Sequence, residues 1–101
     1  MSDEIDRSIQ YADRETGGRY TVSLPDGSSA RLDIVKLSDT HIVASSTFVP
    51  PAYRGLNIAE EMVEQLIADA RTKGWVITPS CWFVADEFAR HAPDWDDVLK
   101  H

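Results

Sequence analysis

A change in hydrophobic periodicity near Gly55 constrains the fold of this chain more than any other feature of its sequence. Before this glycine, apolar and polar residues alternate in three stretches, and after it apolar residues recur at intervals of three and four. Alternation is typical of strands with one buried face, whereas the longer intervals are typical of an amphipathic helix. The sequence therefore predicts an α+β protein, with most strands in its first half and the helices in its second.

The first half of the chain predicts an antiparallel meander. Pro25-Asp26-Gly27 and Ser38-Asp39-Thr40 are turn sequences that separate the alternating stretches. Pro50 and Pro51 end the last stretch, because proline has no N–H group for a ladder hydrogen bond. The three predicted strands span residues 19–24, 30–37 and 42–49.

The second half predicts a helix followed by a buried strand. An apolar stripe follows Gly55, and Gly74 is a typical helix end. Residues 75–78 are an apolar run before Pro79, and a helical crossover lets such a run pair in parallel with residues 42–49. The stripe of the helix consists of Ala59, Met62, Val63, Leu66, Ile67 and Ala70.

A last helix is predicted over residues 81–91, with Ser80 as its cap and Pro93 beyond its end. The order of elements is then β-β-β-α-β-α, and its single parallel pair flanks the N-terminus of the central helix. The inward side chains of the last helix are expected to be Phe83, Val84 and Phe88.

At 101 residues, the chain has the length of one ordinary domain. Residues 1–18 are polar and end in two glycines, which predicts a loosely ordered leader with one helical turn near residues 4–12. The folded domain is expected to span residues 19–101.

Charge and cysteine content narrow the partners and the compartment. The formal net charge is −7 and basic residues never cluster beyond a pair, which argues against nucleic acid and anionic membranes as partners. Cys81 is the single cysteine, so an internal disulfide and a thiolate metal cluster are excluded within one chain. A reducing, cytoplasmic location is therefore expected, with no signal sequence and no membrane span. His41, His91 and His101 have no metal-site spacing, so no metal is predicted.

The segment between the third strand and the central helix resembles a known signature. Its sequence is Val-Pro-Pro-Ala-Tyr-Arg-Gly-Leu-Asn-Ile-Ala over residues 49–59. It resembles the pyrophosphate-binding signature of the GNAT superfamily of N-acetyltransferases, which is Arg or Gln, two residues, Gly, one residue, then Gly or Ala. Arg54 and Ala59 match it, while Asn57 replaces the first glycine and Leu56 stands where many relatives have a basic residue. Asn is among the few residues that tolerate a positive φ, so the turn is expected to form.

Two later segments make the resemblance more specific. Pro-Ser-Cys-Trp-Phe-Val at residues 79–84 and Arg-His at residues 90–91 are similar to the small, truncated GNAT-like acetyltransferases of about a hundred residues. The resemblance covers residues 19–99. It implies a minimal GNAT-like acyl-CoA N-acyltransferase fold.

The same resemblance implies that acetyl-coenzyme A donates an acetyl group to an amine, whose identity the sequence leaves open together with the oligomeric state. Unpaired amides at a helix N-terminus suit the pyrophosphate, which an acidic chain must receive without a basic field. The residues expected to bind the coenzyme are Val49, Arg54, Gly55, Leu56, Asn57, Ile58 and Ala59.

Cys81 is the candidate catalytic residue, because similar small acetyltransferases carry a cysteine at this Pro-x-Cys position. A small buried hydrophobe is the alternative interpretation of this residue. If catalytic, the thiol is either a general acid for the departing coenzyme or a nucleophile that takes the acetyl group first. Many relatives have His-Thr-Glu where this chain has Ser46, Thr47 and Phe48, so two titratable side chains are missing.

Two other functions remain open on these residues. The missing His and Glu favour a non-catalytic acyl-CoA-binding module. Asn57, Leu56 and the net charge favour a ligand-free interaction domain of GNAT-like shape. Of the remaining residues, Trp75 and Trp82 are expected in the core. His91 and the acidic residues around Trp95 are expected to be surface groups.

Overall fold

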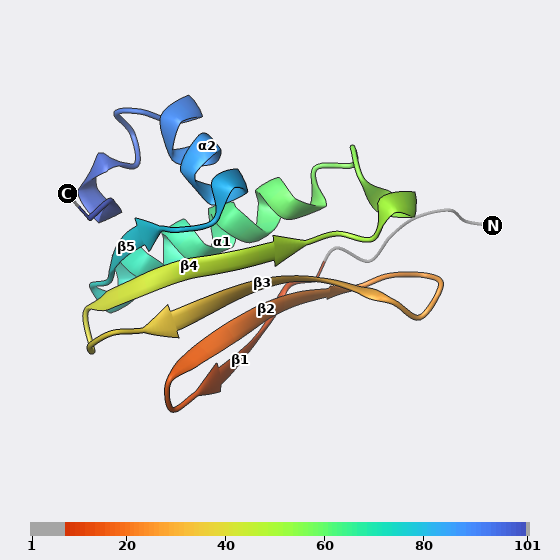
Figure 1. Cartoon of the computed structure of the whole chain (residues 1–101), viewed down its shortest axis with the longest axis horizontal. Coiled ribbons are helices and arrows are strands. Elements are labelled where there is room, and N and C mark those ends of the chain that lie inside the picture. The colour runs from red at the N-terminus through yellow and green to blue at the C-terminus, as the bar shows by residue number, and fades with distance from the viewer. Residues whose placement is uncertain (1–7, 101) are drawn as a thin grey trace.

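Five strands form one sheet in the order β1-β2-β3-β4-β5 in the computed structural model, which describes residues 8–100 (Figure 1). Neighbouring strands are antiparallel from β1 to β4, and β4 and β5 are parallel. The strands are β1 Gln10–Arg14, β2 Gly17–Ser23, β3 Ser29–Lys36, β4 His41–Phe48 and β5 Val76–Pro79; the helices are α1 Ile58–Lys73 and α2 Trp82–Arg90, with short 3-10 turns η1 Pro51–Tyr53 and η2 Asp96–Val98.

The predicted α+β class is confirmed, and the three predicted strands correspond to β2, β3 and β4. Strand β1 was not predicted, and the helical turn expected near residues 4–12 is wrong for Gln10, Tyr11 and Ala12, which are extended. The earlier part of that turn lies outside the described residues. Only Tyr11 of β1 is half-buried, so the strand carries no alternation that a sequence could reveal.

Gly17 and Gly18 are buried strand residues rather than the end of a loose leader. A side chain at Gly17 would collide with the Ile34 carbonyl, and one at Gly18 would collide with the Tyr11 ring. These glycines therefore allow β1 and β3 to approach β2 closely.

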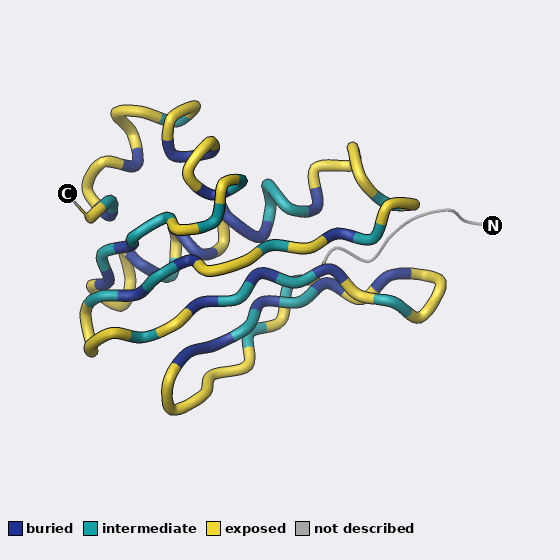
Figure 2. The backbone as a smooth tube through the Cα atoms, viewed as in Figure 1, coloured by how far each residue is buried: buried dark blue, intermediate teal, exposed yellow. Residues whose placement is uncertain are grey.

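Helix α1 packs behind the sheet and encloses the core, which is the dark region of Figure 2. Its predicted stripe is buried except for Ala59, which is half-buried, and Ile58 is buried as well. Gly74 ends the helix with a φ of 75°, in the left-handed region that glycine adopts without strain. Tyr20, fully buried in β2, ties the sheet to this helix by donating a hydrogen bond to Asp69 at 2.7 Å.

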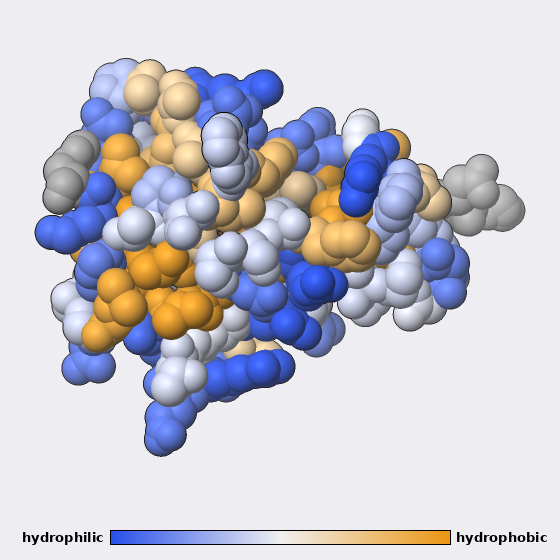
Figure 3. Space-filling model, in the orientation of Figure 1, coloured by the Kyte–Doolittle hydropathy of each residue, from blue (hydrophilic) through white to orange (hydrophobic). Residues whose placement is uncertain are grey.

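The opposite face of the sheet carries no helix among the described residues (Figure 1). Figure 3 shows this face, where apolar side chains gather near the end of β3. Val35 and Leu37, at and just beyond that end, are large apolar residues that are 41% and 61% exposed. No described helix is long and apolar enough to cross a membrane.

Strands β4 and β5 pair only over residues 41–44 and 76–79 and then diverge. The pairing of β4 with β3 shifts register between Asp33 and Ile34, so Ser45 is an extra residue in β4. The two residues that follow β5 still contact the last paired residue of β4. The amides of Ser80 and Cys81 both donate to the Ala44 carbonyl, at 3.1 and 2.9 Å.

Two expectations about α2 are wrong. The N-cap is Cys81 rather than Ser80, so the sulfur lies at the first turn of the helix. Trp82 is 92% exposed and is not a core residue, whereas Trp75 is buried as predicted. The reason is helical phase: Val84 and Phe88 point inward, and Trp82 lies two residues before Val84, on the solvent side.

Candidate active site

A cavity of about 320 Å³ lies where β4 and β5 diverge, and we call it the splay cavity. Its walls come from the end of β4, the turn before α1, the first turn of α1 and the start of α2. The lining residues are Thr47, Phe48, Val49, Tyr53, Arg54, Gly55, Asn57, Ile58, Ala59, Glu60 and Phe83.

All but one of the residues expected to bind the coenzyme line this cavity. The exception is Leu56, which is 41% exposed and lies outside the lining. The turn brings the others together because Gly55 and Asn57 both have positive φ, 85° and 66°. The expectation that Asn57 takes the backbone conformation of the missing glycine is therefore confirmed.

The first turn of α1 supplies backbone donors to the cavity wall. The amide of Glu61 makes the first intrahelical hydrogen bond, to the Asn57 carbonyl at 3.0 Å. The amides of Ile58, Ala59 and Glu60 precede it and have no intrahelical acceptor. Together with the positive end of the helix dipole, such amides attract an anion. The carboxylate of Glu60 also lines the cavity and opposes that attraction.

Arg54 does not extend freely from the turn. Its Nε donates to the Val49 carbonyl at 2.9 Å, and its guanidinium carbon lies 6.0 Å from the centre of the Phe48 ring. Arg31 of β3 approaches the same ring, with its guanidinium carbon at 4.9 Å. No local pattern in the sequence predicts this cluster, because only the β3–β4 register places Arg31 opposite Phe48.

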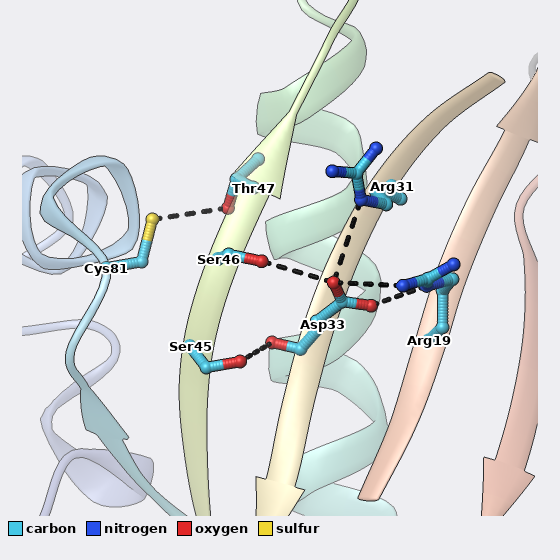
Figure 4. Close-up of polar contacts among 7 residues, drawn as sticks. All are labelled: Arg19, Arg31, Asp33, Ser45, Ser46, Thr47 and Cys81. Carbon is cyan, nitrogen blue, oxygen red and sulfur yellow. Dashed lines mark hydrogen bonds and ion pairs between the residues drawn. The ribbon is translucent and has the colours of Figure 1, made fainter. Parts of the chain in front are cut away.

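Cys81 is half-buried beside the splay cavity, with its sulfur 3.5 Å from the hydroxyl oxygen of Thr47, a lining residue (Figure 4). Thr47 faces this way because it pairs with the buried Leu32 and so shares the inner face of the sheet. Sequence reasoning placed Cys81 near the β4–β5 divergence but did not identify Thr47 as its neighbour.

The surroundings of Cys81 favour its thiolate. Burial alone would raise the pKa of the Cys81 thiol, but the Thr47 hydroxyl and the amides of Val84, Phe83 and Thr47 outweigh it and hold the pKa below its usual value. The side chain makes no capping hydrogen bond in α2, so the helix amides act on the sulfur chiefly through their electrostatic field. A cysteine in such a position ionises more readily than a free thiol.

On the other face of the sheet, Asp33 joins three strands in a cluster that we call the outer network: Arg19, Arg31, Asp33 and Ser46 (Figure 4). Arg19 donates to both carboxylate oxygens, at 2.6 and 3.3 Å, and Ser46 donates at 3.1 Å. Burial raises the pKa of Asp33, but the hydrogen bonds from Arg19 and Ser46 and the nearby charges outweigh it and hold the pKa below its usual value. Sequence reasoning missed this cluster, which depends on the register of three strands.

A second hollow, of about 550 Å³, adjoins the first and shares Asn57 and Glu60 with it. Its other lining residues are Glu61, Glu64, Glu87, Arg90 and His91. Glu87 is buried there, and burial raises its pKa, with a further contribution from the charge of Glu60. Four carboxyl groups make this hollow acidic.

Neither His41 nor His91 lines the splay cavity. His91 stacks on Trp95, which is buried, with ring centres 3.9 Å apart. His41 begins β4 and its Nε2 lies 2.7 Å from the Thr78 hydroxyl. His101 lies outside the described residues. Within residues 8–100, no group of three or more metal-binding side chains is present.

Comparison with known protein families agrees with this geometry. The family model described as GCN5-related N-acetyl-transferase matches residues 19–98, from β2 to the end of η2. No curated protein matches the chain. The matched region contains the turn that lines the splay cavity, the diverging strands and the cysteine at the start of α2. The chain therefore belongs to the GCN5-related N-acetyltransferase family.

Proposed function

We propose that this protein is an N-acetyltransferase that uses acetyl-coenzyme A as its donor and an amine as its acceptor. Membership of the family supports acetyl transfer in general. The observation that carries the finer proposal is the splay cavity, which brings the signature turn and the neighbourhood of Cys81 to one hollow.

In this proposal the coenzyme lies along the cavity with its phosphates at the turn. The unpaired amides of residues 58–60 and the side chain of Arg54 would bind the pyrophosphate. Val49, at the end of β4, and the wall formed by Phe83 would contact the pantetheine arm. The thioester would then lie toward Thr47, which lines the cavity, and toward Cys81 beside it.

Acetyl transfer begins when the neutral amine attacks the thioester carbonyl carbon. A backbone N–H near the end of β4 would stabilise the negative charge that develops on the carbonyl oxygen. As the carbon–sulfur bond breaks, we assign Cys81 the role of general acid, which gives its proton to the departing coenzyme A thiolate. The nitrogen loses its extra proton to water, and Cys81 regains one from water, so the cycle closes.

The lowered pKa of Cys81 is consistent with this role, because a proton donor is most effective when its pKa is close to the working pH. The amine would be deprotonated by water or would arrive neutral. Ser46 and Phe48 cannot act as bases, and in register they lie opposite Asp33 and Arg31 on the outer face.

Titration of acetyl-coenzyme A, followed by NMR, tests the site. We expect larger shifts for the backbone amides of residues 54–59 than for those of residues 19–37, because the former line the cavity and the latter form the meander. Shifts centred on the β2–β3 hairpin would refute the proposed site. Absence of any stabilisation by coenzyme A in a thermal melt would instead favour an interaction domain.

A second function, a non-catalytic acyl-CoA-binding module, is favoured by one observation. Neither position 46 nor position 48 supplies a titratable side chain at the end of β4. Binding of acetyl-coenzyme A without turnover, across a panel of small amines and peptides with free amino groups, would support that module and refute the enzyme.

A further inference from the structure

Two arginines from distant parts of the chain meet on one aromatic ring at the rim of the splay cavity. The guanidinium carbon of Arg31 lies 4.9 Å from the centre of the Phe48 ring, and that of Arg54 lies 6.0 Å from it. Phe48 and Arg54 line the cavity, whereas Arg31 reaches the ring from β3. A guanidinium at such a distance from an aromatic ring is held by cation–π attraction.

These two guanidiniums differ from four other cations of the described chain because neither has a recorded hydrogen bond to a carboxylate. Lys36, Arg71 and Arg90 each lie within 3.0 Å of an aspartate oxygen, and Arg19 donates twice to Asp33. Arg31 approaches Asp33 only to 3.7 Å, which is beyond hydrogen-bond distance. Arg54 uses its Nε on the Val49 carbonyl, which leaves its terminal N–H groups for another acceptor.

The acidic surroundings of the cavity would repel an anion, so free N–H donors matter for binding one there. The chain has a net charge of −7, and Glu60 adds a carboxylate to the cavity wall itself. Leu56 is apolar where a basic residue would have strengthened the turn. The amides at the start of α1 are thus the only other donors that we have assigned to an anion at this end of the cavity.

We propose that Arg31 and Arg54, held on Phe48, form a phosphate-binding clamp at the rim of the splay cavity. A guanidinium offers paired N–H groups that match the oxygens of a phosphate, and two of them balance the two charges of the esterified pyrophosphate in coenzyme A. Phe48 is the platform that holds both cations at the rim. Arg31 lies outside the signature turn, so the clamp adds a residue to the site.

The clamp adds detail to the proposed function. It rests on that function only for the statement that the bound phosphates are those of coenzyme A. Free pyrophosphate has the same chemistry and is the probe that separates the two questions. Pantetheine contains the thiol arm of the coenzyme without its phosphates, so it is the matching negative probe.

The test is the affinity of each probe for four proteins: the unaltered chain, Arg31→Gln, Phe48→Leu and Arg14→Gln. We expect Arg31→Gln to weaken pyrophosphate and coenzyme A by about fivefold to tenfold, the loss typical of a partly exposed charge-assisted hydrogen bond. Phe48→Leu should weaken both by about twofold to fivefold, because it removes the cation–π contact. Pantetheine should bind all four proteins equally.

Arg14→Gln is the matched control, since it removes the same charge at the far end of the sheet. Arg14 pairs with Gly17 in β1 and β2, whereas Arg31 pairs with Phe48 at the other end of β3. Its effect on either phosphate probe should stay within about twofold, as expected of a distant, screened charge.

The outcomes separate the clamp from the proposed function. Equal pyrophosphate affinity for Arg31→Gln and Arg14→Gln would overturn the clamp. Arg31-dependent binding of pyrophosphate without any binding of coenzyme A would support the clamp and refute the proposed function. Arg31→Lys, which keeps the charge but not the planar fork, should recover only part of the lost affinity, and its melting temperature checks that folding is intact. Affinity of Arg31→Lys equal to that of the unaltered chain would contradict a clamp that needs the planar fork.

Discussion

Ser46 and Thr47 are neighbours in β4, yet their side chains take part in two different clusters on opposite faces of the sheet (Figure 4). Ser46 belongs to the outer network, where the Asp33 carboxylate is bonded by Arg19 as well. Thr47 faces the splay cavity, and its hydroxyl oxygen lies at a long 3.5 Å from the Cys81 sulfur. A carboxylate that accepts several hydrogen bonds holds strands together, whereas a sparsely bonded group beside a hollow remains available to a ligand.

This contrast has an energetic basis. Hydrogen bonds to a half-buried carboxylate contribute to stability because they replace the water that the group has lost. A thiol beside an open cavity contributes little to stability, and its bonds can be completed by a substrate. A change at Asp33 should therefore alter stability, and changes on the cavity side should alter chemistry.

Cys81→Ser is expected to have the largest effect, and it tests whether the cavity side of the sheet carries the chemistry. It keeps the shape of the side chain and removes the readily ionised thiol, so we expect turnover to fall by roughly 10²-fold or more while coenzyme binding is nearly unchanged. Steady-state kinetics and a binding titration on one preparation measure both. A modest fall in melting temperature with normal turnover would show that Cys81 only packs, and the general-acid role would be abandoned.

Asp33→Asn tests the other side of the sheet. The loss of charge weakens the bonds from Arg19 and Ser46, so we expect the free energy of unfolding to fall by about 1–2 kcal/mol, with turnover per folded molecule unchanged. Urea denaturation measures the effect, and Asp39→Asn in an exposed turn is the control. An unchanged stability together with lost activity would place Asp33 in the chemistry instead.

The same carboxylate predicts a pH dependence with a definite sign. The folded state holds the pKa of Asp33 below its usual value, so the folded protein releases this proton more readily than the unfolded chain. Its stabilisation is complete above the ordinary aspartate pKa of about 4 and is lost as the pH falls through the lower folded value. The difference in free energy of unfolding between the unaltered chain and Asp33→Asn should therefore shrink as the pH falls below about 4. A deficit that persists undiminished at pH 2 would contradict this assignment.

Asn57→Gly tests the cavity side through the backbone of the turn, and it leaves the contact between Thr47 and Cys81 in place. A left-handed backbone at φ 66° is less strained for glycine, so we expect coenzyme A to bind more tightly, by up to about 1 kcal/mol. Isothermal titration gives the difference. Weaker binding would mean that the Asn side chain itself contacts the ligand.

The smallest expected effect concerns Thr47→Val, which removes the hydroxyl beside the sulfur and keeps the shape. Alkylation of Cys81 at pH 7 should slow by about twofold to threefold, as the loss of one weak hydrogen bond raises the thiol pKa. Thr47→Ser should restore the rate. Acetyl-coenzyme A should protect the thiol from the reagent, and an unprotected thiol would place the thioester elsewhere.

Much of the fold could be predicted because its signals are local. The stripe in α1, the alternation in β2 and β3 and the glycine at position 74 each follow from residues a few positions apart. The turn at residues 54–59 was recognised in the same way, and the structure places all of it except Leu56 in the cavity wall. Strand β1 escaped prediction because its exposed residues carry no period.

With the exception of β1, the sequence by itself determined which segments would be strands and helices, and that Asn57 would adopt a glycine-like backbone ahead of α1. Only the tertiary structure decided which side chains meet. The extra residue at Ser45 fixes which face each later residue of β4 occupies, because a shift of one position reverses every side chain in a strand. That register places Thr47 beside Cys81, Ser46 beside Asp33 and Phe48 beside Arg31. Long-range contacts of this kind cannot be predicted from the local pattern of the chain.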